Sequence, residues 1–154
     1  TFLNPDSDPT GSGYQIQQSL IAVGSGGLTG RGFGQSIQKF EYLPEPIGDS
    51  IFAVYAEEFG FLGAIVLIGA LMSLAMRGYK IANQSADIFG TLLVTGFITL
   101  IITQAFLNIA AMVGVAPLSG LPLPFISHGG TSLLATLAAL GIVLNVSKYR
   151  KIKK

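Results

Sequence analysis

The sequence predicts an all-α integral membrane protein, in which three transmembrane helices follow a large extracytoplasmic loop of helical and irregular structure. Half of the 154 residues are hydrophobic and only 11% are charged, whereas a soluble domain usually has about 25% charged residues. The apolar residues gather in long blocks, and a spanning helix needs about 20 mostly apolar residues in succession. Basic residues follow two of these blocks, as they do at the cytoplasmic ends of spanning helices.

The three predicted spans differ in length. The first covers Ile51–Met76 and the second covers Ile88–Val113. The third, at about Thr131–Val146, is short for a bilayer. We therefore expect it to begin earlier, near Ile126, or to lie among neighbouring helices. Together the spans make up a transmembrane region over residues 51–154.

The positions of Lys and Arg predict which side of the membrane each loop faces. Arg77 and Lys80 follow the first span, and five basic residues follow the third, in or beside the tail 147–154. Those two sides should be cytoplasmic. The segment 1–50 and the loop 114–130 are then extracytoplasmic.

The segment 1–50 contains one predicted helix and one glycine-rich loop. Ser12 is suited to cap a short helix over residues 13–23. Residues 24–34 (GSGGLTGRGFG) have neither the GxGxxG nor the GxxxxGK[ST] spacing of nucleotide-binding loops. We therefore expect these residues to form tight turns in which glycine adopts positive φ. As an alternative, the bare backbone N–H groups of this loop could meet a phosphate together with Arg31.

Five of the eight acids fall in or beside residues 42–58, which read YLPEPIGDSIFAVYAEE. Asp49 directly precedes the first span, and a helix N-cap or a site acid would explain it equally well. Glu57 and Glu58 lie two turns inside the predicted helix. A charge at the bilayer centre costs about 2.5–3.5 kcal/mol on insertion scales. We therefore expect these two acids near the outer edge, either facing water or an Arg or lining a wet cavity.

Small and polar residues mark two packing faces. Ala56, Gly60 and Ala64 recur every four residues and would admit a close neighbouring helix. Gln104 and Asn108 share one face of the second span. In lipid such side chains need partners, so they either join helices, which is favoured, or line a substrate cavity.

The loop 114–130 is predicted to be irregular and re-entrant-like, because it contains three prolines and four glycines. Non-helical backbone at membrane depth is tolerated where it is buried in protein or lines a cavity. His128 in this loop is the only histidine, and the chain has no cysteine. A zinc site is therefore disfavoured, and a packing or hydrogen-bonding role is favoured over acid–base chemistry.

Three stretches together resemble one family: GSGYQIQQSLIAVGSGGLTGRGFGQSIQKFEYLPEPIGDSIFAVYAEEFGFLGA, GLPLPFISHGGTSLL and the basic tail. The chain resembles the SEDS family (shape, elongation, division and sporulation), and QSIQKFEYLPE is closer to its division-type FtsW branch than to its elongation-type RodA branch. The resemblance covers about residues 4–150. It implies the last three of about ten transmembrane helices, and hence a piece of a longer protein.

The resemblance implies a peptidoglycan glycosyltransferase that polymerises lipid II on the outer side of the membrane. It places the general base at Asp49, with Glu41 and Glu45 as supporting acids. We expect Arg31 and Lys39 to contact the pyrophosphate of the substrate. A divalent cation, Mg²⁺ or Mn²⁺, held by Asp49 and Glu45 is an alternative use of these carboxylates. No nucleotide, haem or zinc is expected.

The same resemblance makes two further residues candidates for binding the substrate or for supporting the site. Ser127 and His128 stand in Ser-His-Gly-Gly, where many members have Ser-Tyr-Gly-Gly. The implied partners are lipid II, undecaprenyl pyrophosphate, a class B penicillin-binding transpeptidase and other division proteins, and nucleic acid is not among them. The implied location is the bacterial cytoplasmic membrane at the division septum, with a cytoplasmic C-terminus. The rival functions are a lipid II flippase and a scaffold for the transpeptidase.

Overall fold

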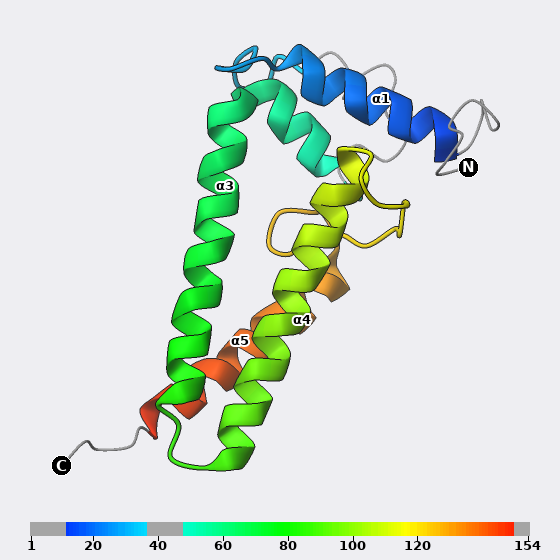
Figure 1. The fold of residues 1–154 in the computed structure, drawn as a ribbon. Helices are drawn as coiled ribbons and strands as arrows, with labels where there is room; N and C mark the ends of the chain where they lie inside the picture. Colours follow the sequence, from blue (N-terminus) through cyan, green and yellow to red (C-terminus); the bar gives the residue numbers. More distant parts are fainter. Residues whose placement is uncertain (1–11, 37–47, 150–154) are drawn as a thin grey trace.

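The computed structural model describes residues 12–36 and 48–149, and its elements there are the helices α1 (Ser12–Ser25), α3 (Ile51–Asn83), α4 (Ile88–Met112) and α5 (Gly130–Lys148). α3, α4 and α5 are each long and apolar enough to span a membrane. α3 and α4 run side by side, α1 crosses one end of this pair, and the last turn of α5 lies at the opposite end (Figure 1). The predicted all-α fold with three spans is confirmed.

The bounds of the spans depart from the predicted bounds mainly in α3. This helix begins where predicted but continues to Asn83, so Arg77 and Lys80 lie within its last turns rather than after it. α4 ends at Met112, one residue earlier than predicted. α5 begins at Gly130, so the alternative start near Ile126 is wrong.

α1 includes the short helix predicted after Ser12. It packs against the ends of α3 and α4 through Ile16, Ser19 and Ala22, which recur every three residues and are buried. The Ser19 hydroxyl also donates to Met112 Sδ at 3.4 Å. The helix is therefore docked on the bundle and covers one end of it.

α3 consists of two helical segments joined at Gly60. This glycine has φ 66° and ψ −164°, a conformation that L side chains rarely adopt. Figure 1 shows the sharp bend between the teal start of α3 and its long green part. Residues 61–83 alone span about 34 Å, enough for the hydrocarbon core. Glu57 and Glu58 therefore lie inside α3, as predicted, but in its short first segment, ahead of a stretch that is by itself long enough to span.

The glycine loop (residues 24–34) makes four backbone hydrogen bonds to α3. They take the place of two hydrogen bonds that an unbroken α3 would make within itself. In a continuous helix the amides of Phe61 and Leu62 would bond to the carbonyls of Glu57 and Glu58. Here those amides donate to the carbonyls of Gly27 and Leu28, at 2.9 and 3.2 Å. The vacated carbonyls of Glu57 and Glu58 accept from the backbone N–H groups at positions 31 and 32, both at 3.0 Å. These four backbone groups of α3 thus all keep a hydrogen bond within the protein.

The small residues at the break in α3 leave room for the backbone of this loop. A Cβ at Gly60 would collide with the backbone of Gly30, and a Cβ at Gly30 would collide with the carbonyl of Glu58. The sequence predicts a neighbouring helix beside Ala56 and Gly60. The close neighbour in the structure is the glycine loop instead. Positive φ at four loop glycines, Gly27, Gly30, Gly32 and Gly34, confirms the predicted tight turns.

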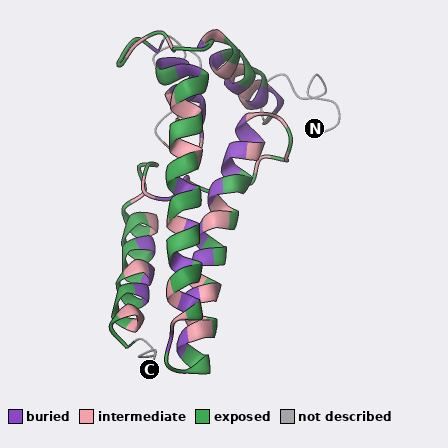
Figure 2. Cartoon of the chain, turned by 60° about the vertical axis from the view of Figure 1, so that its left-hand side comes forward, coloured by how far each residue is buried: buried purple, intermediate pink, exposed green. Residues whose placement is uncertain are grey.

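The core lies along the faces that the long helices turn toward one another. One cluster joins α1, the start of α3 and the end of α4 around Phe52, Ile109 and Met112. A second joins the far ends of α3, α4 and α5 around Ile98 and Val143. Exposed residues cover much of the outer faces of the long helices (Figure 2), as expected for helices that face lipid or further protein.

Candidate functional site

Asp49 lies in a turn immediately before α3, and it does not cap that helix. The N-cap residue is Ser50, whose carbonyl accepts from Ala53 N at 3.0 Å and Val54 N at 3.4 Å. The N-cap interpretation of Asp49 is therefore wrong. The site-acid interpretation of Asp49 is the one that stays open.

Three side chains from separate elements hold residues 48–50. Asn108 of α4 donates through Nδ2 to the Asp49 carbonyl at 2.9 Å. Ser127 donates through Oγ to the Gly48 carbonyl at 2.8 Å. Gln15 of α1 donates through Nε2 to Ser50 Oγ at 3.0 Å. The backbone on both sides of the Asp49 carboxylate is therefore fixed by contacts distant in the sequence.

The irregular loop between α4 and α5 forms one wall of the site. Asn108 Nδ2 also donates to the Leu121 carbonyl at 2.7 Å, and Gln104 Nε2 donates to the Pro122 carbonyl at 2.9 Å. Gly120 lies so close to Asp49 that a Cβ on this glycine would be 3.5 Å from Oδ2. Gln104 and Asn108 thus find partners within the protein, as expected, but these are carbonyls of the loop and of the turn before α3, so the favoured prediction that they join two helices is wrong.

A small cavity of about 40 Å³ lies beside the carboxylate. Its polar lining comes from Gln15, Asp49, Asn108 and Ser119. Apolar groups at the end of α4 and in the loop complete the wall. α1, α4 and the loop therefore enclose the acid from three sides.

Glu57 forms a separate buried acid site. Its side chain is 1% exposed, accepts a hydrogen bond from Ser36 Oγ at 2.6 Å and lies 3.7 Å from Arg31 Nε. The expectation that an Arg faces one of the two acids is met here. The backbone N–H groups of Arg31 and Gly32 are used in the break of α3. They are therefore not open to a phosphate, and this part of the phosphate alternative is wrong.

The remaining predicted site residues divide into two sets. Lys39, Glu41 and Glu45 lie outside the described residues, so their roles stay predictions. His128 is exposed, and within residues 12–36 and 48–149 no side-chain hydrogen bond or ion pair involves it. In the same ranges no group of three or more His, Cys, Asp or Glu side chains is arranged to hold a metal. Because Glu45 is outside these ranges, the proposed cation site also stays a prediction.

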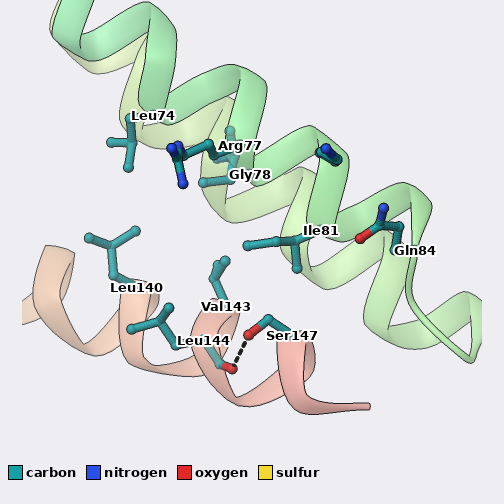
Figure 3. Close-up of a pocket in the computed structure, with 11 residues that line it drawn as sticks. Leu74, Arg77, Gly78, Ile81, Gln84, Leu140, Val143, Leu144 and Ser147 are labelled. Atoms are coloured by element: carbon teal, nitrogen blue, oxygen red, sulfur yellow. Dashed lines mark hydrogen bonds between the residues drawn. The ribbon is translucent and has the colours of Figure 1, made fainter. Parts of the chain in front are cut away.

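A larger cavity of about 520 Å³ lies at the opposite end, between α3 and α5. Figure 3 shows the labelled side chains of the two helices facing each other across it. Its lining is apolar around Leu74, Leu140 and Val143, with Arg77 and Lys80 as the charged members. No carboxylate lines it. It therefore does not suit proton abstraction from a sugar hydroxyl, and the cavity beside Asp49 is the better candidate.

The comparisons with known proteins fit this arrangement. A family model described as "Cell cycle protein", for FtsW, RodA and SpoVE, matches residues 1–152. The chain belongs to the FtsW/RodA/SpoVE family. The SEDS resemblance of the sequence is thereby confirmed, and with its three apolar helices the chain is an integral membrane protein.

Members of the FtsW/RodA/SpoVE family match almost the whole chain. Stage V sporulation protein E of Bacillus subtilis is 48% identical, over 98% of this chain and 41% of the relative. A protein named probable peptidoglycan glycosyltransferase FtsW, from Geobacter metallireducens, is 47% identical, over 97% of this chain and 40% of the relative. The chain thus spans about two fifths of the length of these relatives.

One solved structure is similar to this chain over almost its whole length. It is titled "Structural coordination of polymerization and crosslinking by a peptidoglycan synthase complex". The similarity has a TM-score of 0.78 at 31% identity and covers 99% of this chain and 41% of that chain. The arrangement of α1, α3, α4 and α5 is therefore shared with a chain of that complex.

Proposed function

We propose that this chain provides the extracytoplasmic acid site and three spans of a peptidoglycan glycosyltransferase that polymerises lipid II. Family membership and a relative named as such an enzyme support the reaction class. The observation that carries the assignment of the site is the environment of Asp49. This carboxylate is not used as a helix cap, its backbone is held on both sides, and it borders a small cavity with both polar and apolar lining.

The proposed chemistry is glycosyl transfer with inversion. The 4-hydroxyl oxygen of the acceptor sugar forms a bond to the anomeric carbon of the donor, and the bond from that carbon to the pyrophosphate oxygen breaks. Asp49 takes the hydroxyl proton, and undecaprenyl pyrophosphate leaves with the electron pair. A carboxylate that acts as a general base contributes about 10²–10⁴-fold to such a step.

Four further charged residues have proposed supporting roles. Glu41 and Glu45 raise the basicity of Asp49 by like-charge repulsion, or Glu45 shares a divalent cation with it. Arg31 and Lys39 contact the pyrophosphate, where charge develops as it leaves. Arg31 can do so while paired with Glu57, because a guanidinium carries five N–H donors and this side chain is 40% exposed.

The proposed setting is the bacterial cytoplasmic membrane at the division septum. The basic residues near the ends of α3 and α5 support a cytoplasmic C-terminus, which puts Asp49 on the outer side. The similar solved structure joins polymerization with crosslinking in one complex. This supports a crosslinking penicillin-binding transpeptidase as partner, with other division proteins around it. Ser127 and His128 remain candidates for contacts to substrate.

The polar residues of α4 disfavour the flippase alternative. Thr95 donates to the Thr91 carbonyl at 2.8 Å, and Thr99 shares a hydrogen bond with Tyr79 at 3.0 Å. Gln104 and Asn108 hold loop carbonyls. These groups are thus used within the described part of the protein and do not form an open polar path. The acids Asp49 and Glu57 also lie on one side of the spanning segments.

The decisive experiment replaces Asp49 by Asn in the complete protein that contains this chain. We expect lipid II polymerisation by the purified protein to fall by about 10²-fold or more, because the proton acceptor is lost. The matched control is Asp87→Asn. Asp87 caps α4 through Gly90 N at 3.2 Å, and Asn is an equally good cap.

The outcome of this test separates the proposals. The Asp87→Asn protein should polymerise lipid II at the wild-type rate, and both variants should insert into membranes. An Asp49→Asn enzyme with wild-type activity would remove Asp49 from the mechanism. Transport of lipid II across vesicles without polymer formation would favour the flippase instead.

A further inference from the structure

The side-chain amide of Asn108 is only half satisfied. Its Nδ2 donates to the carbonyls of Asp49 and Leu121, at 2.9 and 2.7 Å. Its Oδ1 is buried and has no hydrogen-bond partner among the described residues, and the whole residue is 2% exposed. A buried acceptor without a partner has lost the hydrogen bonds that it makes to water in the unfolded chain and has gained none in return. Such a group in a native protein therefore calls for an explanation.

The orientation of this amide follows from its two partners. Both are carbonyl oxygens, which only accept hydrogen bonds, so the nitrogen must face them. Exchanging the nitrogen and the oxygen would set Oδ1 against two other acceptors and remove both hydrogen bonds. The unpartnered atom is therefore the oxygen, and it requires a donor.

The cavity beside Asp49 can hold that donor. Asn108 and Asp49 both line it, together with Gln15 and Ser119. Its volume of about 40 Å³ compares with about 30 Å³ for one water in the liquid, and a buried water needs two to four polar partners. The cavity thus accommodates one water or one hydroxyl oxygen, but not a sugar ring.

We propose that Asn108 is a positioning residue for Asp49, and that its Oδ1 accepts a hydrogen bond from a single O–H group held in this cavity. The inference rests on the proposed role of Asp49 as general base. The O–H group belongs either to a water, which can also donate to the Asp49 carboxylate, or to a substrate hydroxyl other than the attacking one. Nδ2 fixes the Asp49 backbone, and the O–H group fixes the environment of its carboxylate.

The test compares Asn108→Ala with Gln104→Ala in the complete protein, using lipid II as substrate and measuring kcat and KM across a pH series. Gln104 is the matched control, because it also holds the loop through one carbonyl but does not bond to residues 48–50. We expect kcat or kcat/KM of Asn108→Ala to fall about 10- to 100-fold, the range caused by misplacing a catalytic group. If the O–H group is a water, the acid limb of the pH–rate profile should also move to higher pH, because the hydrogen bond from that water to the charged carboxylate is lost. Gln104→Ala should keep the wild-type acid limb.

Asn108→Asp is a second test variant, and kcat and KM are separate readouts that distinguish a water from a substrate hydroxyl. Asn108→Asp places a negative charge beside Asp49 and should move the acid limb upward by about one pH unit. A fall in kcat at constant KM identifies a water, whereas a rise in KM identifies a substrate hydroxyl. If folded Asn108→Ala and Gln104→Ala proteins have the same pH profile and the same kinetic constants, the inference is wrong. The proposed function fails separately, if Asp49→Asn is fully active.

Discussion

Glu57 shows how this protein keeps a carboxylate in a dry environment. The side chain is 1% exposed, yet it accepts a 2.6 Å hydrogen bond from Ser36 and faces Arg31. A buried charge is tolerated when it is paired and hydrogen-bonded. Since Arg31 and Glu57 also share a backbone hydrogen bond at the break in α3, the buried acid attaches the glycine loop to the helix by a side chain as well as by backbone.

Replacing Ser36 by Ala tests this attachment. We expect the free energy of unfolding to fall by about 1.5–3 kcal/mol, the range for a hydrogen bond to a charged group. Thermal or denaturant unfolding of the purified protein in detergent measures the change. Ser73→Ala is the control, because the Ser73 hydroxyl is exposed and bonds only to the nearby Ala70 carbonyl, at 2.8 Å. Equal effects of the two substitutions would contradict the role of Ser36.

At the residue scale the sequence could predict the acid but not what surrounds it. Asp49 stands out because it is a carboxylate between turn residues and an apolar block. Its contact with Asn108 joins residues 59 positions apart, and it depends on how α4 packs against the start of α3. The four-residue step from Gln104 to Asn108 indicated a face turned into protein, but nothing in the pattern named its partners. Gln15 carries no comparable signal.

At the scale of elements, the long apolar blocks predicted α3, α4 and α5 because lipid requires continuous apolar helices. The break in α3 could not be predicted in the same way. A single glycine is tolerated inside a helix. Its conversion into a bend depends on four hydrogen bonds to residues 27–32. Periodicity along one segment does not report contacts of this kind.

Gly60→Ala tests the break. The new Cβ would meet the backbone of Gly30, and the backbone conformation at position 60 is strained for any L side chain. We expect a loss of stability above about 3 kcal/mol, seen as a large fall in melting temperature or in folded yield. Gly69→Ala in the same helix is the control, because a Cβ there meets nothing within 4 Å. It should be neutral or stabilise α3 by up to about 1 kcal/mol.

At the scale of the whole molecule, the two ends differ in character. One end gathers α1, the glycine loop and Asp49, and the other carries Arg77, Lys80 and the last turn of α5 (Figure 1). The distribution of basic residues predicts that the second end is cytoplasmic. This orientation can be predicted from the sequence because the prediction depends on charge at the helix ends and not on packing, and it stays a prediction.

Single cysteines test the orientation directly, because this chain contains none of its own. Phe33 and Tyr149 are 85% and 69% exposed and lie toward opposite ends. In the complete protein without other cysteines, we expect Phe33→Cys to react with a membrane-impermeant maleimide on intact spheroplasts. Tyr149→Cys should react only after permeabilisation. The reverse pattern would invert the topology and place Asp49 inside the cell.

The exchange of hydrogen bonds at Gly60 also ties the position of Asp49 to the glycine loop. Asp49 directly precedes the short first segment of α3, and the break at Gly60 sets the direction of that segment relative to residues 61–83. The amides of Phe61 and Leu62 bond here to Gly27 and Leu28, whereas in a straight helix they would bond to Glu57 and Glu58. We therefore expect a variant whose loop cannot dock to have a straighter α3 and a displaced Asp49.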